Sequence, residues 1–292
     1  MERRTGLRCD LAVDMAESEG MTGRIECETL SGKYGVKREK FVIRSRAEEE
    51  KTGLKRGCYV TLSRKGIYPE TDDEKIYFER CLAKSIKDTI SIIGLKDDFS
   101  VLVLGLGNGY MTADALGKRT VEKIITTRKA DYGKNLRKVC AFAASVSGIT
   151  GIDSFEIAEG LTREISPELI ICVDSLCAFR TDRIGRSYQL SSCGIKAGSG
   201  SDKPGGKRLC EESLGVPVLA IGVPFVVSAR RLLHDACSGE VGFDPVSPEE
   251  DMYVTLRDVD AVLTECSEVV AAAINIALQP SFDVMDVLMS AR

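Results

Sequence analysis

Histidine is the residue type that this sequence almost lacks, and its scarcity limits the available chemistry. His234 is the one histidine among 292 residues, and the 11 cysteines include no Cys-x-x-Cys pair. Structural zinc sites are usually built from such pairs or from cysteine together with histidine. The sequence therefore predicts no metal site.

The familiar nucleophilic arrangements are also missing. A cysteine nucleophile needs a base within reach, and His234 stands among apolar helix residues, where a packing role is commoner. Ser199 lies in Gly-Ser-Gly and not in the Gly-x-Ser-x-Gly turn of many hydrolases. A cysteine or serine hydrolase is thus disfavoured.

Nothing in the sequence indicates secretion, a membrane or a nucleic-acid partner. Residues 1–6 are charged and contain no apolar core, and the longest apolar stretch, 214–229, is interrupted by glycine and proline. The cysteines are scattered and odd in number, which is typical of a reducing compartment. A net charge of −4 gives no basic surface for nucleic acid. We expect a cytoplasmic protein without membrane or direct nucleic-acid contacts.

Alternating apolar strands and amphipathic helices predict an α/β fold. We expect one domain over 1–292, with an N-terminal segment at 1–19, a β-rich subdomain at 20–70 and an α/β core at 71–292. The predicted architecture is a three-layer α/β/α sheet with an N-terminal antiparallel β ribbon. The predicted strands are 24–30, 36–44, 58–63, 100–106, 169–173, 187–191 and 216–223. The predicted helices are 71–93, 112–128, 134–144, 153–165, one through Leu232, and a long last helix after Asp258 whose apolar stripe predicts burial. A turn is predicted at Pro224, a glycine-rich loop at 198–206, and a linker or flap at 239–250.

Two glycine-rich segments invite a cofactor assignment, and neither has the required spacing. In Gly105-Leu-Gly107-Asn-Gly109 the third glycine comes one residue early for a dinucleotide fingerprint, and no acidic residue ends a strand about twenty residues later. The segment 201–208 lacks the first glycine and the final Ser or Thr of a phosphate loop. We predict no cofactor, and we interpret Gly107 and Asn108 as part of a turn that lets the backbone approach a substrate.

Two aspartates follow apolar runs that are typical of buried parallel strands. Asp114 comes after the 105–109 turn, and Asp174 comes directly after Ile-Ile-Cys-Val. Carboxyl ends of parallel strands form the sites of open α/β sheets, so these side chains are candidates for a catalytic pair. Two alternatives stay open, because Asp114 can stabilise a helix N-terminus and Asp174 can bond to a neighbouring loop.

A cluster of arginines follows Asp174 along the chain. Arg180, Arg183 and Arg186 recur at intervals of three residues. Such a cluster is either a solvated face or a rim that binds acidic side chains of a substrate.

Several blocks in the same order resemble the spore germination protease family. They are residues 8–14, 101–108, 112–117, 147–152, 173–176, 194–200, 214–224 and 252–255. The resemblance implies an endopeptidase that degrades small acid-soluble spore proteins, is located in the cytoplasm of the forespore or spore core, and forms a homotetramer. It also implies a fold like that of the hydrogenase-maturation proteases, removal of an N-terminal propeptide, and catalytic roles for Asp114 and Asp174. Family substrates carry glutamate near the cut bond, which suits Arg180 and Arg183 as substrate-binding residues.

The chemistry that we predict is water-mediated peptide hydrolysis. One aspartate, ionised, takes a proton from water, and the other, protonated, donates to the scissile group. Backbone N–H groups of the 105–109 turn are candidates for oxyanion stabilisation. Two alternatives remain: a metal-dependent peptidase in which the aspartates are ligands, and a non-enzymatic binding protein on the same scaffold.

Overall fold

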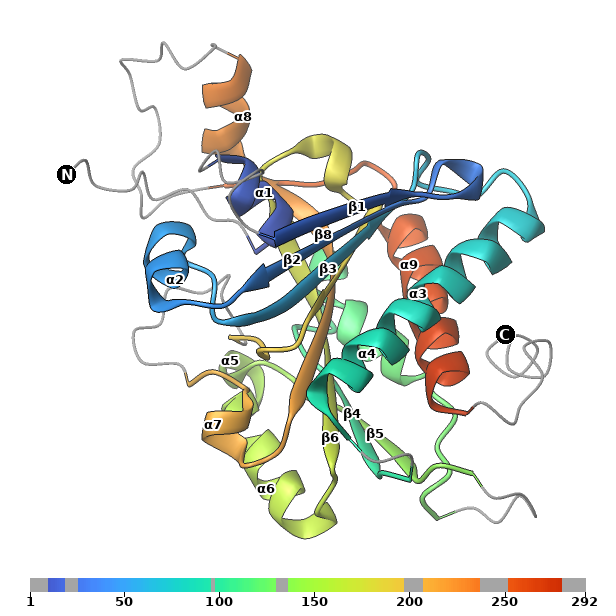
Figure 1. Ribbon diagram of the computed structural model, residues 1–292, viewed down its shortest axis with the longest axis vertical. Helices are drawn as coiled ribbons and strands as arrows, with labels where there is room; N and C mark the ends of the chain where they lie inside the picture. The colour runs from blue at the N-terminus through green and yellow to red at the C-terminus, as the bar shows by residue number, and fades with distance from the viewer. Residues whose placement is uncertain are drawn as a thin grey trace.

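The computed structural model describes residues 10–18, 26–95, 98–129, 136–196, 207–236 and 252–279. In this part of the chain one nine-stranded sheet forms the centre of the molecule, with the order β1-β2-β3-β7-β8-β6-β4-β5 and with β9 paired to β8 (Figure 1). The strands are β1 Glu26–Ser31, β2 Lys37–Ile43, β3 Gly57–Ser63, β4 Val101–Gly105, β5 Val139–Ala143, β6 Leu169–Ala178, β7 Ser187–Ser191, β8 Val218–Ser228 and β9 Tyr253–Val254.

The helices cover both faces of this sheet. They are α1 Ala12–Ser18, α2 Arg46–Thr52, α3 Asp72–Ile93, α4 Leu116–Val121, α5 Ser147–Thr150, α6 Ser154–Ile165, α7 Glu211–Leu214, α8 Ala229–Ala236 and α9 Val259–Leu278. Short 3₁₀ turns lie at η1 Lys33–Gly35, η2 Thr112–Asp114 and η3 Thr181–Arg183.

The sheet has a parallel half and an antiparallel half. Strands β5, β4, β6 and β8 run parallel to one another, whereas β1, β2, β3 and β7 form an antiparallel series in which β7 pairs with β8. The predicted N-terminal ribbon is confirmed, and it continues the main sheet as one edge. The predicted α/β/α architecture is confirmed as well.

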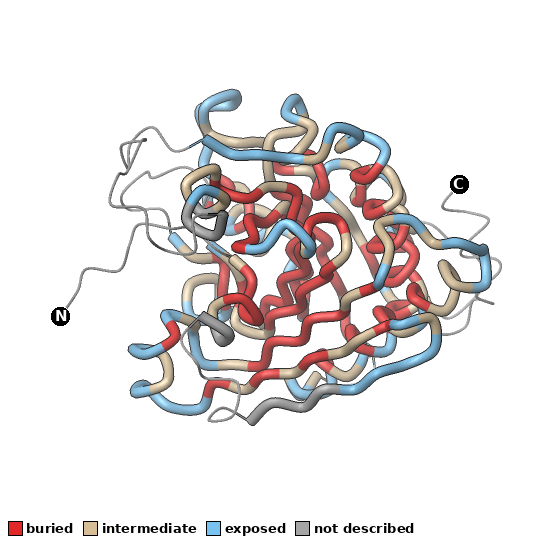
Figure 2. Tube along the Cα trace, turned by 90° about the horizontal axis from the view of Figure 1, so that it is seen from above, coloured by how far each residue is buried: buried red, intermediate tan, exposed pale blue. Residues whose placement is uncertain are grey.

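Alternating side chains of the strands make a core on each face. Val101, Val103 and Ile171 pack with α3 and α9 on one face, and Leu102, Leu104 and Ile170 pack towards α6 on the other. A tube coloured by burial shows the buried strands enclosed by exposed outer segments (Figure 2). Helix α3 has the caps that its sequence predicts, because the Thr71 side chain accepts from the Glu74 N–H and Gly94 ends the helix in the left-handed conformation.

Several predicted elements differ from the structure. Residues 139–143 form the edge strand β5 where a helix over 134–144 was predicted, and the helix predicted over 112–128 is reduced to η2 and α4. The turn predicted at Pro224 is also wrong, because β8 continues through it to Ser228. The register between β6 and β8 shifts between Leu176 and Cys177, so the proline lies at a bulge, where a missing N–H is tolerated.

Helix α9 is long and apolar enough to cross a membrane by length and composition alone. In the fold 78% of that stretch is buried, mainly against α3 and α4. It is therefore the core helix that its apolar stripe predicts. The propeptide prediction, the glycine-rich loop at 198–206 and the linker at 239–250 lie outside the described residues.

Candidate active site

The candidate site lies where β4 and β6 separate. The last paired residues are Gly105 of β4 and Val173 of β6, while β6 continues beside β8 to Ala178. Beyond β4 the chain turns away to η2 and α4, and it reaches β5 on the side of β4 opposite to β6. This is a topological switch point, at which open α/β sheets form a crevice.

Asp174 is the first residue of β6 beyond its pairing with β4. We predicted that it follows the strand, but it lies within β6, because pairing with β8 extends the strand by several residues. Its side chain is buried, with 6% exposed, and Oδ1 accepts from the Ser175 N–H at 2.9 Å. Burial, with further contributions from the nearby charges of Asp114 and Asp10, raises the pKa of Asp174 well above its ordinary value.

Asp114 is held by the glycine-rich turn that precedes it. Oδ2 of Asp114 accepts from the Asn108 N–H at 2.7 Å, and no bond from the carboxylate to a helix N–H is formed within the described residues. The carboxylate therefore faces the turn and does not cap α4. Burial raises the pKa of Asp114, and the bond from Asn108 opposes that rise.

The glycines around Asp114 allow the backbone of the turn to touch the sheet. Gly107 has φ of 97°, and a Cβ there would lie 2.9 Å from Asp114 Oδ1. A Cβ on Gly117 would lie 2.6 Å from the Val173 carbonyl oxygen, and one on Gly105 would meet the Gly117 carbonyl. Only residues without a side chain permit these approaches, so the glycine pattern holds Asp114 beside β6.

The structure thus brings the two predicted aspartates together. The η2 turn contacts β6, which brings Asp114 close enough for its negative charge to add to the effect of burial on the pKa of Asp174. Both carboxyl groups accept one backbone N–H, so burial distinguishes them: it raises the pKa of both, and it raises that of Asp174 well above its ordinary value, which favours the protonated form of Asp174. Each carboxyl group uses one oxygen to accept a backbone N–H, and within the described residues the other oxygen makes no hydrogen bond.

A third carboxyl group, Asp10, lies near this pair and was given no role from the sequence. Oδ2 of Asp10 accepts from the Cys177 N–H at 2.9 Å, and the Asp10 N–H donates to the Cys177 carbonyl at 2.9 Å. Its own carbonyl accepts from Gln189 Nε2 at 2.8 Å. The only sequence signal was its position in the 8–14 block, because the pairing with Cys177 joins residues far apart in the chain.

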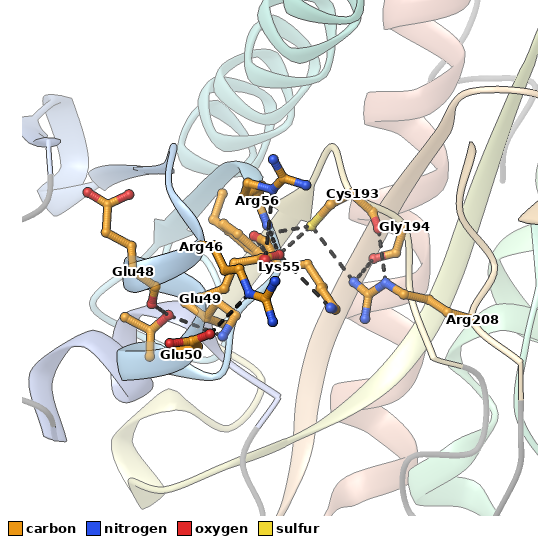
Figure 3. Close-up of polar contacts among 12 residues, drawn as sticks. Arg46, Glu48, Glu49, Glu50, Lys55, Arg56, Cys193, Gly194 and Arg208 are labelled. Atoms are coloured by element: carbon orange, nitrogen blue, oxygen red, sulfur yellow. Dashed lines mark hydrogen bonds and ion pairs between the residues drawn. The ribbon is translucent and has the colours of Figure 1, made fainter. Parts of the chain in front are cut away.

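A cavity of about 230 Å³ opens beside Asp10 and extends to Gly222, the strand partner of Asp174. Its wall includes the cationic residues Lys55, Lys196 and Arg208. Arg208 donates to the carbonyl oxygens of Cys193 at 3.0 Å and Gly194 at 2.8 Å (Figure 3). The cavity therefore combines one acidic and three basic side chains next to the candidate pair.

Comparison with known proteins assigns the family. A family model described as germination protease matches residues 13–239, which include both aspartates of the pair. The chain belongs to the germination protease family. The resemblance inferred from the sequence blocks is thereby confirmed, and family membership makes this chain a peptidase of spore germination.

Curated germination proteases align with almost the whole chain. The protein of Caldanaerobacter subterraneus subsp. tengcongensis is 34% identical, with 94% of this chain and 95% of the relative covered. That of Clostridium acetobutylicum is 33% identical over 82% and 84%, and that of Clostridium tetani is 30% identical over 96% and 98%. Among solved structures, the [NiFe] hydrogenase maturation protease HycI from Thermococcus kodakarensis KOD1 is 15% identical, covers 65% of this chain and 98% of its own, and gives a TM-score of 0.34.

The predicted substrate-binding arginines of this germination protease have different surroundings. Arg180 is exposed and pairs with Asp182 at 2.7 Å. Arg183 is largely buried, with 11% of its side chain exposed, and it forms ion pairs with Asp14 at 3.4 Å and Glu39 at 3.8 Å. The structure therefore gives Arg183 a role in joining α1, β2 and η3, and its role in substrate binding stays a prediction.

Some backbone N–H groups of the 105–109 turn in this germination protease already have acceptors within the protein. The N–H of Leu106 donates to Val173, and that of Asn108 donates to Asp114, so within the 105–109 turn these two are committed and not directed at an oxyanion. Gly107 and Asn108 hold Asp114 in place, and contact of either with a substrate stays a prediction. Within the described ranges, no three Asp, Glu, His or Cys side chains are grouped as ligands for one metal ion.

Proposed function

We propose that this chain hydrolyses peptide bonds in small acid-soluble spore proteins during germination, with Asp114 and Asp174 activating water as a pair. The observation that carries this proposal is the position of both residues at the β4–β6 switch point: the η2 turn that carries Asp114 contacts β6, and Asp174 lies buried in that strand where it leaves β4. Two carboxyl groups in such surroundings share one proton and titrate as a unit. The cytoplasmic location, the tetramer and the propeptide stay predictions.

In the proposed mechanism the surroundings of each carboxyl group determine its role. Asp114, which accepts the Asn108 N–H, is the ionised base that takes a proton from the attacking water. Asp174, buried and protonated, donates its proton to the scissile carbonyl oxygen as water adds to the carbon. When the tetrahedral intermediate collapses, Asp174 takes a proton back from one of its hydroxyl groups and gives that proton to the leaving nitrogen as the C–N bond breaks. After release of the products, a proton passes from Asp114 back to Asp174, which restores the starting state of the pair.

The test is cleavage of a purified small acid-soluble spore protein by the purified chain, followed by mass spectrometry of the products. We expect discrete fragments from the parent protein and none from Asp114→Asn or Asp174→Asn. Asp88→Asn is a matched control, because Asp88 lies on the outer part of α3 and pairs with Arg38. Normal turnover by either site variant would refute the aspartate mechanism.

Two further arms of the assay separate the alternatives. Cleavage that persists after treatment with a chelator supports the aspartate pair, whereas cleavage that is lost with the chelator and restored by a metal ion identifies a metal-dependent peptidase. Stable binding of the spore protein without any fragment would identify a binding protein on this scaffold. Each outcome assigns one of the three functions.

A further inference from the structure

The cavity beside the candidate pair carries more positive than negative charge. Its wall includes the cationic side chains of Lys55, Lys196 and Arg208, and Asp10 is the one carboxylate among the described residues that line it. The Asp10 carboxylate accepts from the Cys177 N–H, so it already has a backbone partner. A concave site with an excess of cations favours a ligand that carries negative charge.

Arg208 is held in a fixed position on this wall. Its Nε donates to the Cys193 carbonyl at 3.0 Å, and its Nη2 donates to the Gly194 carbonyl at 2.8 Å. The Cys193 Sγ also lies 4.0 Å from the Lys55 carbonyl, and Figure 3 shows Cys193 between the two cationic side chains. Within the described residues Nη1 makes no hydrogen bond, so two N–H donors of the guanidinium remain for a ligand.

The cavity cations differ in their surroundings from the arginines that follow Asp174 in the sequence. Arg180 is in an exposed ion pair, and Arg183 is buried beside two carboxylates. In the part of the chain that the structure describes, Lys196 and Arg208 form no ion pair, and Lys55 has a carboxylate oxygen no nearer than 4.0 Å. A ligand carboxylate would therefore displace no acidic partner of Lys196 or Arg208.

Leu176 places this cavity next to the candidate pair. It comes two residues after Asp174 on β6, and alternate residues of a strand share a face, so the two side chains stand about 7 Å apart along the strand. Leu176 lines the cavity and lies over Gly222, where a Cβ would be 2.5 Å from Leu176 Cγ. An extended peptide advances about 3.3 Å per residue. A substrate side chain a few residues from the scissile bond therefore reaches the cavity.

We propose that this cavity is the specificity site of the peptidase: it binds an acidic side chain of the substrate, with Arg208 as the fixed contact and Lys55 and Lys196 as further positive charges. The inference rests on the proposed function, because it names the side chain that the enzyme selects in its substrate. The planar guanidinium matches a carboxylate and can form two parallel bonds with it. An amide of the same shape has no charge and one acceptor oxygen, so the site distinguishes glutamate from glutamine.

The test compares acidic peptides with their amide counterparts. The bond that the parent cleaves in a spore protein is first located by mass spectrometry. Peptides that span it are then made with each acidic residue near the bond changed singly to its amide. We expect one of these changes to lower kcat/KM of the parent by about tenfold to a hundredfold, which is the range for a hydrogen bond to a charged group. The other positions should have little effect.

Variants of the enzyme locate this preference in the cavity. Arg208→Gln should lower the acid-to-amide ratio of kcat/KM by about tenfold or more. Lys196→Gln should lower it only a few-fold, because Lys196 is exposed and exposed charge pairs are weak. Arg56→Gln is the matched control: it removes one positive charge next to Lys55, at an exposed residue that does not line the cavity, and should leave the ratio unchanged.

Peptide binding measured by fluorescence anisotropy tests the cavity without catalysis. Asp174→Asn should bind the acidic peptide without cleaving it and show the same preference in Kd, and adding Arg208→Gln should remove that preference. Binding also separates this inference from the proposed function. If the parent cleaves nothing, hydrolysis is refuted, and Kd values for peptide pairs that tile the spore protein still decide whether the cavity selects acidic side chains.

Several outcomes would overturn the proposal. A ratio near one at every position in the parent, a ratio unchanged in both Arg208→Gln and Lys196→Gln, or an equal loss in Arg56→Gln would each contradict it. A preference removed by Arg180→Gln alone would place the acidic side chain at the arginines that follow β6. Arg208 also supports two loop carbonyls, so if Arg208→Gln is unfolded, Lys196→Gln decides: an unchanged ratio there would refute the site.

Discussion

Replacing Asp174 with asparagine should abolish activity while leaving the fold at least as stable at neutral pH. The two side chains have nearly the same shape, so the bond to the Ser175 N–H can persist through the amide oxygen. The substitution removes the general acid, and general acid–base catalysis contributes about 10²–10⁴-fold to rate. We therefore expect kcat to fall by at least that factor.

The stability effect has the opposite direction. Burial and the charges of Asp114 and Asp10 raise the pKa of Asp174 above that of a carboxyl group in the unfolded chain. Between these two pKa values the folded state binds more protons than the unfolded state, so stability is fully present below the unfolded pKa and declines as pH rises through the folded pKa. Asparagine has no such dependence. The variant should match the parent in acid and exceed it at neutral and alkaline pH.

Thermal unfolding and cleavage measured on the same preparations will check this prediction. In a chain of about 150–250 residues, a change of 1 kcal/mol in the free energy of unfolding moves Tm by about 2–4 °C. A stabilisation of this size by Asp174→Asn is therefore measurable in this slightly longer chain. A kcat within a few-fold of the parent would refute the acid role. A Tm several degrees below the parent at neutral pH would refute the buried, protonated state.

Two other substitutions test the surroundings of the pair. Gly107→Ala should lose activity and destabilise the fold by about 1–3 kcal/mol, because its φ of 97° is strained for alanine and the new methyl group meets the Asp114 carboxylate. Gly160 lies within α6, and a methyl group added there would meet open space, so Gly160→Ala should raise the free energy of unfolding by about 0.5–1 kcal/mol. Thermal unfolding of both variants checks this, and the same change in Tm for Gly107→Ala and Gly160→Ala would contradict the account. Arg183→Met should lower stability by about 3–5 kcal/mol, since it removes the buried guanidinium that faces the carboxylates of Asp14 and Glu39, whereas Arg180→Met at an exposed pair should change it by about 1 kcal/mol or less. If Arg183→Met raised KM and left the Tm unchanged, Arg183 would belong to the substrate site.

Sequence reasoning was most successful where local signals agree. The start and end of α3 follow from a capping threonine and a terminal glycine, and the strands β4 and β7 follow from apolar runs bounded by turn residues. The two aspartates were found for the same reason, since each comes after an apolar run that is buried in the sheet.

The failures come from contacts between distant parts of the chain. Residues 139–143 contain three alanine or cysteine positions that are compatible with a helix, but pairing with β4 makes them a strand. The turn predicted at Pro224 neglected the bulge opposite Leu176, which accommodates the proline inside β8. Asp10 was missed because its place near the pair depends on a bond from the backbone N–H of Cys177. Cys177 is distant in sequence, and a backbone donor leaves no mark in the residue pattern.

The close approach of Gly117 to Leu106 and Val173 has a consequence for how this enzyme family can vary. The contact there is between backbone atoms, so neither a rotamer change nor the exchange of one aliphatic side chain for another can change the distance between these segments. The spacing between Asp114 and Asp174 therefore does not depend on which aliphatic side chains fill the hydrophobic core. A chain that keeps glycine at positions 105, 107 and 117 is therefore expected to keep this spacing while the residues of its hydrophobic core change.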